Sequence, residues 1–292
     1  MRCLLFALVL VSRAAAQAPD TLTAADGWRS SLQASVAGNQ SAYRNWQEGG
    51  VDAVAVTAGL DGRFDRVVGR VLTTQSLRLA YGVLRQDTLD WRKALDLARY
   101  AASVEQATDQ VIRPSASLTV RSQFTPGFDD DPEPERYPGM VVAPGVPLKV
   151  SDVLSPLVLG QSVGVAVRPG GGVVARTGVG LKETVVAIQR LRPVYGNALG
   201  QAVRVEAGLD LEVVFEREVM DNVTLRSRLA SFQGFGQFGS EPPDAVFENL
   251  LVLTVNDLLN VTLDASALFD ADISNEVQLR EALSVGLALA IL

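Results

Sequence analysis

Charged side chains recur at alternate positions between residues 203 and 215. Arg204, Glu206, Asp210 and Glu212 lie among Val, Ala and Leu residues. Because successive side chains of a β-strand point to opposite faces, a strand here carries one apolar face and one charged face. Ionised groups of both signs on one face can pair with one another or line a water-filled passage. A helix would scatter the same residues around its axis, so the pattern favours a strand.

The side chains that most often perform catalysis are missing from this sequence. It contains no His, and its one Cys is Cys3. Ser-His-Asp hydrolysis, Cys-His catalysis and His-based zinc sites are therefore excluded. We expect neither enzyme activity nor a cofactor. A membrane-embedded phospholipase or protease is the least favoured alternative, because those families use an active-site His.

Polar residues occupy the corresponding positions of other alternating segments. We predict that the following residues line the inner face of one sheet: Arg70, Arg78, Arg113, Arg121, Gln123, Arg204, Glu206, Asp210, Glu212, Arg226, Arg228, Asp264 and Arg280. Opposed charges across a narrow lumen would pair or surround a water-filled passage. Arg121 and Gln123 could also orient a solute there, although internal salt bridging is the favoured interpretation. The alternative for the whole set is the wet face of a soluble sheet.

The N-terminus has the layout of a secretory signal. A basic start precedes an apolar run from Leu4 to Val11, and small residues follow up to Ala16. We predict a signal peptide over residues 1–16, a short mature leader over 17–27 and a barrel over 28–292. The only Cys lies inside the signal, so the mature chain has no disulfide and no thiol ligand.

Short segments with strand character and turn signals between them fill the rest of the chain. We predict strands over residues 28–36, 54–60, 67–83, 91–104, 112–124, 153–167, 173–186, 203–215, 223–229, 247–255, 259–269 and 277–292. Asp61-Gly62 is predicted to form a tight turn. The segment 91–104 also has a helical composition, but its position in a series of hairpins favours a strand. This even spacing is typical of a closed meander barrel.

The composition favours a membrane barrel over a soluble one. Aromatic residues make up only 6% of the chain and hydrophobic residues 48%, so the apolar faces consist mainly of Val, Leu and Ala. Such faces suit lipid tails, and a final strand that can pair with the first leaves no open edge. We predict an all-β, antiparallel up-and-down transmembrane β-barrel of about twelve strands in the cell outer membrane, with lipid as a partner. A soluble periplasmic β-rich binding protein is the alternative.

The charge of the chain limits its partners. A formal net charge of -7 argues against nucleic acid, which needs clustered Lys and Arg. One predicted loop, residues 128–149, is strongly acidic, with Asp129, Asp130, Asp131, Glu133 and Glu135. We interpret it as a solvated loop. A weak calcium site is the alternative, since calcium binds clustered carboxylates, but the spacing matches no calcium motif.

Several short motifs resemble an uncharacterised family of Bacteroidetes outer-membrane proteins, catalogued as domain of unknown function 3078. They are Asn45-Trp46-Gln47-Glu48-Gly49-Gly50, Arg121-Ser122-Gln123-Phe124-Thr125-Pro126-Gly127, Asn222-Val223-Thr224-Leu225 and Val255-Asn256. The resemblance spans roughly residues 28–292 and implies an outer-membrane barrel, without an activity or substrate. The assembly machinery is an expected partner, although outer-membrane barrels often end in an aromatic residue and this sequence ends in Leu292. We therefore expect a small passive pore, with a small solute, or a structural membrane protein.

Overall fold

The computed structural model describes residues 27–42, 52–87, 89–108, 111–137, 139–143 and 145–292. The predicted signal peptide, nearly all of the predicted leader and the Asn45 to Gly50 motif lie outside the described residues. No helix in the described part of the chain is long and apolar enough to cross a membrane.

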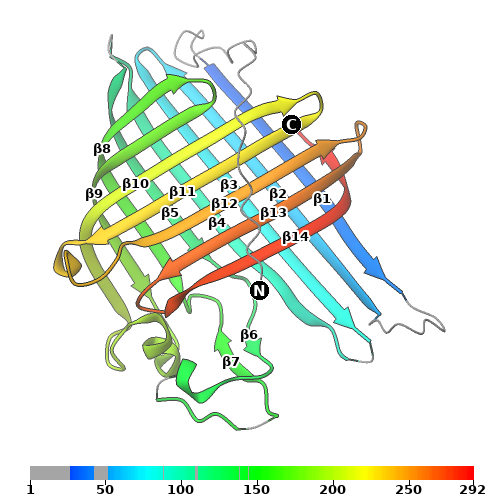
Figure 1. The fold of residues 1–292 in the computed structure, drawn as a ribbon. Coiled ribbons are helices and arrows are strands. Elements are labelled where there is room, and N and C mark those ends of the chain that lie inside the picture. Colours follow the sequence, from blue (N-terminus) through cyan, green and yellow to red (C-terminus); the bar gives the residue numbers. More distant parts are fainter. Residues whose placement is uncertain (1–26, 43–51, 88, 109–110, 138, 144) are drawn as a thin grey trace.

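Twelve antiparallel strands close into one barrel (Figure 1). The barrel strands are β1 (Gly27–Ser41), β2 (Ala53–Val68), β3 (Val71–Gln86), β4 (Arg92–Gln106), β5 (Ile112–Ser122), β8 (Leu157–Gly170), β9 (Val173–Val185), β10 (Val203–Met220), β11 (Val223–Gly234), β12 (Asp244–Thr254), β13 (Leu259–Asp270) and β14 (Ser274–Ala290). Each strand pairs with its neighbour in the chain, and β14 pairs back with β1 from Gln33↔Ala290 to Gly38↔Val285. The predicted up-and-down barrel of about twelve strands is confirmed.

The two faces of the wall differ as the alternation predicts. On β10 the odd-numbered side chains point out, and Val205 is 57% exposed. The even-numbered residues of the same strand point into the barrel. On β14 Leu279 is 80% exposed, and every second residue from Val277 to Leu289 shares its face. The Val and Leu rows therefore form the outside of the barrel and do not meet in a dry interior.

Two predicted strand boundaries were wrong. The predicted strand 67–83 is broken at Gly69, whose φ of +55° turns the chain into a hairpin. The predicted turn at Asp61-Gly62 lies in the middle of β2, where Asp61 pairs with Gln33 of β1. A two-residue hairpin turn needs positive φ, and of these two glycines only Gly69 has it. The ambiguous segment 91–104 forms β4, as predicted.

The connections at the two ends of the barrel differ in length. One end, called the turn end, has the tight turns Gly69-Arg70, Gly171-Gly172 and Asp221-Asn222. The other, called the loop end, has the long connections 123–156 and 186–202, together called the cap. The cap contains the two-stranded sheet of β6 (Gly127–Asp129) and β7 (Leu148–Ser151), with the 3-10 helices η2 (Pro134–Arg136) and η3 (Gln189–Tyr195). The cap lies at the bottom of Figure 1. The turn end is opposite, and β14 ends there.

Glycines allow the wall to bend closely at β8, β9 and β10. Gly164 and Gly178 pair with each other across β8 and β9 on the lumen side. A Cβ on Gly164 would lie 2.0 Å from the carbonyl oxygen of Thr177, and one on Gly178 would lie 2.5 Å from that of Val163. A side chain at either position would force the two strands apart, so this curvature depends on glycine.

Candidate functional site

An ion pair crosses the full width of the lumen. Arg99 Nη1 on β4 donates to Glu248 Oε2 on β12. These strands stand six places apart around the twelve-stranded ring, so they are opposite each other. Glu248 also accepts a hydrogen bond from Arg228 Nη1 on β11, at 3.2 Å. The lumen is therefore bridged from wall to wall at mid-height.

Further ion pairs extend this bridge around the lumen. Arg228 Nε donates to Glu212 at 2.8 Å, and Arg176 contacts the same carboxylate at 3.3 Å. Arg176 also donates to Glu105 at 2.8 Å. Arg168 holds Glu105 with two hydrogen bonds, of 2.7 and 2.8 Å, and the Glu105 side chain is only 1% exposed. A bidentate guanidinium and a second cation compensate the loss of water around this carboxylate.

A second set of ion pairs joins β3 to β13. Asp264 accepts hydrogen bonds from Arg78 Nη2 at 3.0 Å and from Arg280 Nη2 at 2.8 Å. Asp61 lies 3.8 Å from Arg78. Together the two sets form what we call the belt: Asp61, Arg78, Arg99, Glu105, Arg168, Arg176, Glu212, Arg228, Glu248, Asp264 and Arg280.

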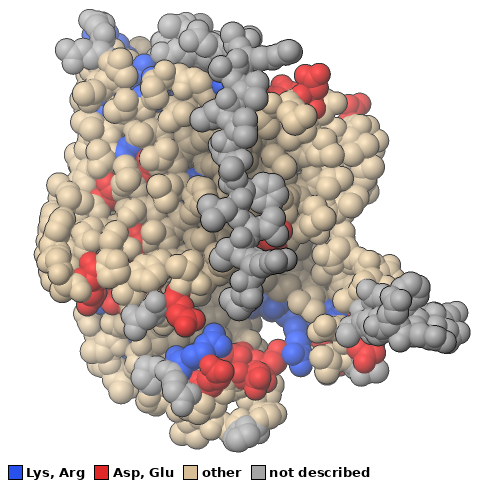
Figure 2. Space-filling view, in the orientation of Figure 1, with Lys and Arg blue, Asp and Glu red and all other residues tan. Residues whose placement is uncertain are grey.

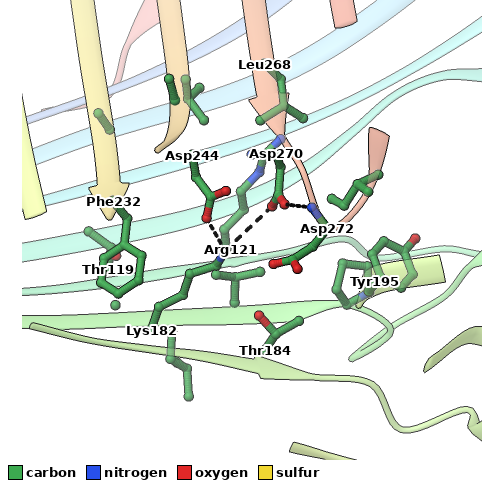
Figure 3. A pocket seen from close by; sticks show the side chains of 18 of the residues that line it. Thr119, Arg121, Lys182, Thr184, Tyr195, Phe232, Asp244, Leu268, Asp270 and Asp272 are labelled. Carbon is green, nitrogen blue, oxygen red and sulfur yellow. Dashed lines mark hydrogen bonds and ion pairs between the residues drawn. The ribbon is translucent and has the colours of Figure 1, made fainter. Parts of the chain in front are cut away.

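A cavity of about 1020 Å³, called the outer chamber, lies on the loop-end side of the belt. Figure 3 shows Thr119, Arg121, Lys182 and Phe232 facing it from several strands. Arg228 also lines the chamber, so the belt forms part of its floor. Residues of the cap complete the lining, and Figure 2 shows the molecule hollowed between the barrel wall and the cap.

Acidic residues surround Lys182 near the loop end of the chamber. Lys182 Nζ donates to Asp244 and lies 3.6 Å from Asp270 and 3.8 Å from Glu206 (Figure 3). The neighbouring Arg204 lies 3.2 Å from Glu206 and also contacts Asp272. This rim carries four carboxylates and two cations.

Hydrogen bonds fasten the cap to the wall. Asp96, on β4, accepts hydrogen bonds from the backbone N–H of Phe124 at 2.8 Å and of Thr125 at 2.9 Å. Within the cap, Tyr195 donates its hydroxyl to the carbonyl oxygen of Val150 at 2.9 Å and so joins the two long connections to each other. Burial raises the pKa of Tyr195 to about 12, so this hydroxyl stays protonated and able to donate at neutral pH. The cap is thus held over the chamber at several points.

Two carboxylates of the acidic loop, those of Asp129 and Asp130, are engaged with protein groups. Asp129 accepts hydrogen bonds from the Tyr137 hydroxyl and from Arg136, the latter at 3.3 Å, and Asp130 lies 3.0 Å from Arg92. Burial and the bond to Asp129 raise the pKa of Tyr137. Within the described ranges there is no group of three or more His, Cys, Asp or Glu that could hold a metal ion.

The structure places most of the predicted inner-face residues at inward positions of the barrel strands. These are Arg78, Arg113, Arg121, Arg204, Glu206, Asp210, Glu212, Arg226, Arg228, Asp264 and Arg280. Arg226 pairs with Glu216 at 2.8 Å near the turn end. Gln123 follows β5 and donates to the carbonyl oxygens of Asp152 and Ser155 in the cap. The prediction for Arg70 needs correction, because the break at Gly69 puts Arg70 in the turn between β2 and β3 and not on the inner face of a strand.

Both residues of the cross-lumen pair, Arg99 and Glu248, were missed from the sequence. Arg99 lies in the segment with helical composition, so its alternation was not evident. Glu248 is followed by Asn249 and the apolar run 250–253, which hides the period of two. Arg168 precedes Pro-Gly-Gly-Gly and lies just beyond the predicted strand 153–167. Their charge alone could have identified these residues, because a charged side chain in an otherwise apolar strand of a membrane barrel is expected to face the lumen.

Comparison with known families gives one match in this chain. Residues 38–128 match the family described as Protein of unknown function (DUF3078). This segment covers β2 to β5, and it includes Arg78, Arg99 and Glu105 of the belt. No curated protein matches the chain.

The chain is similar to several solved structures at low identity and low TM-score. An outer membrane channel from Pseudomonas putida F1 has 9% identity and a TM-score of 0.38, over 94% of this chain and 99% of that one. The translocator domain of the autotransporter NalP from Neisseria meningitidis has 9% identity and a TM-score of 0.35, over 92% and 90%. The Pseudomonas putida toluene transporter TodX has 9% identity and a TM-score of 0.32, over 94% and 93%.

Proposed function

We propose that this protein is a non-enzymatic outer-membrane β-barrel that acts as a narrow pore for small hydrophilic solutes, closed at rest by the belt. The observation that supports it is the cross-lumen pair of Arg99 and Glu248, which closes the lumen with ions instead of packed apolar side chains. A packed core would be a permanent plug. Paired ions can exchange a partner for water or for another ion, so the same passage can open.

The outer surface supports a lipid environment. The exposed Val and Leu rows run around the barrel, and a soluble protein rarely exposes apolar surface on that scale. Figure 2 shows a mostly uncharged wall, with charged residues gathered at the loop end and also present at the turn end. Exposed aromatic residues stand at both ends: Trp28 lies 5.3 Å from the Arg66 guanidinium at the turn end, and Phe235 stacks on Phe238 at the loop end. Exposed aromatic residues at the two ends of a barrel are typical of the two membrane–water interfaces.

The lengths of the connections support an orientation in the membrane. Outer-membrane barrels have short periplasmic turns and longer extracellular loops. We therefore place the turn end in the periplasm and the cap outside the cell. The outer chamber then opens toward the outside, and the belt separates it from the periplasm. The assembly machinery that inserts such barrels is a partner under the same proposal.

Two other functions predict different behaviour. A soluble periplasmic binding protein would be released from cells by breaking the outer membrane without detergent. A purely structural barrel would stay in the membrane and carry no current. Cell fractionation separates the first from a membrane barrel, and only electrical recording separates the second from a pore.

The pore is tested by recording from the folded full-length protein in planar lipid bilayers. We expect discrete current steps of low amplitude, because the belt obstructs the lumen. The matched control is protein from the same preparation that has been unfolded by heat before addition. A barrel that migrates as folded on unheated gels, inserts into bilayers and stays silent over many insertions would refute the pore.

A further inference from the structure

One arginine on the chamber floor has no ion-pair partner in the part of the chain that the structure describes. Arg121, on β5, points into the lumen and lines the outer chamber (Figure 3). In contrast to the arginines of the belt, its side chain makes no hydrogen bond or ion pair with any residue in the described ranges. We propose that Arg121, assisted by Arg228, binds the carboxylate or phosphate group of a small organic anion in the outer chamber. This inference deepens the proposed pore, since it rests on a chamber that is open to the outside.

The charges around Arg121 favour an anion. Arg99, Arg228 and Arg280 are near enough to act on it electrostatically, and the only carboxylate acting on it as strongly is Glu248. Glu248 already accepts hydrogen bonds from Arg99 and Arg228. Like charges in a partly enclosed site repel each other more strongly than in bulk water. A bound anion would relieve that repulsion at Arg121, because Glu248, the carboxylate that acts on it, is already shared by Arg99 and Arg228.

The charge balance of the belt agrees with this local picture. Among the described residues, the belt contains six arginines and five carboxylates. Arg121, directly opposite Arg99 in the strand register, adds a seventh arginine against these five carboxylates, and Asp210, which also lines the chamber, accepts a hydrogen bond from Ser162 instead. The rim around Lys182 has the opposite excess, so the positive charge is confined to the floor of the chamber.

The chamber also has the room and the polar groups for such a ligand. Arg121 is an exposed residue although it lies within the barrel, so its guanidinium is open to the cavity. The hydroxyls of Ser117 and Thr119 share its face of β5 and line the same cavity. A guanidinium can bind a carboxylate or phosphate through two parallel hydrogen bonds. A cavity of about 1020 Å³ admits a solute considerably larger than a single phosphate.

The test is calorimetric titration of the folded full-length protein in detergent with sodium citrate and with inorganic phosphate. Sodium chloride at equal ionic strength is the reference. The variants are Arg121→Gln, which removes the charge, and Arg121→Lys, which keeps it without the planar fork. The matched control is Arg63→Gln, since Arg63 also faces the lumen but pairs with Asp65 at 2.8 Å, outside the chamber. Migration on unheated gels checks that each variant is folded.

We expect saturable binding of at least one of the two anions by the native protein. Arg121→Gln should weaken it by about tenfold or more, Arg121→Lys by less, and Arg63→Gln by less than about twofold. The inference is overturned if neither anion binds beyond the chloride reference, if Arg121→Gln binds like the native protein, or if Arg63→Gln weakens binding as much. Calorimetry does not require conduction. A silent barrel that binds citrate would refute the pore alone, and a conducting barrel that binds neither anion would refute this site alone.

Discussion

Replacing Glu248 with glutamine should both destabilise the barrel and raise its conductance. Glu248 joins β12 to Arg99 on the opposite wall and to Arg228 on the neighbouring strand. Glutamine has nearly the same size, and its amide oxygen can still accept one hydrogen bond. The substitution therefore removes a charge from the centre of the belt without opening a void. Arg99 and Arg228 would then face each other across the lumen with less compensation.

The magnitude follows from the burial of the pair. The side chains of Arg99 and Glu248 are 20% and 19% exposed, so water screens them only in part. Breaking a buried ion pair by removing one partner costs about 3–5 kcal/mol, and we expect about 3 kcal/mol here because the lumen retains some solvent access. The matched control is Glu216→Gln, whose pair with Arg226 has side chains 43% and 47% exposed. An exposed pair contributes about 0–1 kcal/mol, so the control should lose little stability.

Two assays measure the two effects. Urea unfolding in lipid vesicles, followed by tryptophan fluorescence, gives the free energy of unfolding of each variant. Planar bilayer recording gives the current, which we expect to be larger for Glu248→Gln than for the native protein and unchanged for Glu216→Gln. In the double variant Arg99→Gln, Glu248→Gln the stability loss should be smaller than the sum of the single losses, because neither member of the pair is left charged opposite a neutral partner and Arg228 keeps its ion pair with Glu212.

The reasoning about the belt would be refuted by either of two results. One is a stability loss for Glu248→Gln no larger than that for Glu216→Gln. The other is a properly inserted Glu248→Gln barrel whose current equals that of the native protein, since the ion pairs would then not obstruct the passage.

Other features give further predictions. Gly164→Ala should prevent folding to the compact form seen on unheated gels, because its Cβ would lie 2.0 Å from a carbonyl oxygen of the neighbouring strand; Gly200→Ala, with nothing within 4 Å, should fold normally. Leu211→Arg, on the lipid side of the middle of β10, should lower the free energy of unfolding in vesicles by about 2–4 kcal/mol, and an unchanged value would argue against burial in lipid. Asp96→Ala should loosen the cap and speed its cleavage by added protease on intact cells, whereas Asp131→Ala, in an exposed part of the cap, should leave the rate unchanged.

The alternation of side chains was enough to predict the wall of the barrel. A period of two over β10, β13 and β14 requires one apolar and one polar face, whichever strand lies beside them. The ends of the strands were harder to predict, because Asp61-Gly62 has the chemistry of a turn and Gly69-Arg70 does not. The pairing of β2 with β1 decided between them, since Asp61 has a partner on the adjacent strand. The turn preference of Asp61-Gly62 was outweighed by pairing with β1, which continues on both sides of these two residues.

The ion pairs were beyond reach of the sequence for a different reason. Arg99 and Glu248 are 149 residues apart in the chain, and no pattern within either segment refers to the other. Their meeting depends on the closure of twelve strands, which puts β4 and β12 on opposite sides. It also depends on how closely the walls approach, and glycines such as Gly164 and Gly178 help to set that distance by allowing a tight bend. Strand number and curvature, not local sequence, therefore selected the partners.

The same closure explains why one arginine is left over. A charged residue on the inner face can pair only with residues that closure of the barrel brings to the same height. Each carboxylate has two oxygens and can therefore accept hydrogen bonds from only a few arginines. Asp264 serves Arg78 and Arg280, and Glu248 serves Arg99 and Arg228. Arg121 faces the outer chamber. The carboxylate that acts on it most strongly, Glu248, already accepts hydrogen bonds from Arg99 and Arg228. A wall that only needed to be sealed would gain nothing from this extra charge, whereas a passage that draws anions from outside would use it at the point where the lumen narrows.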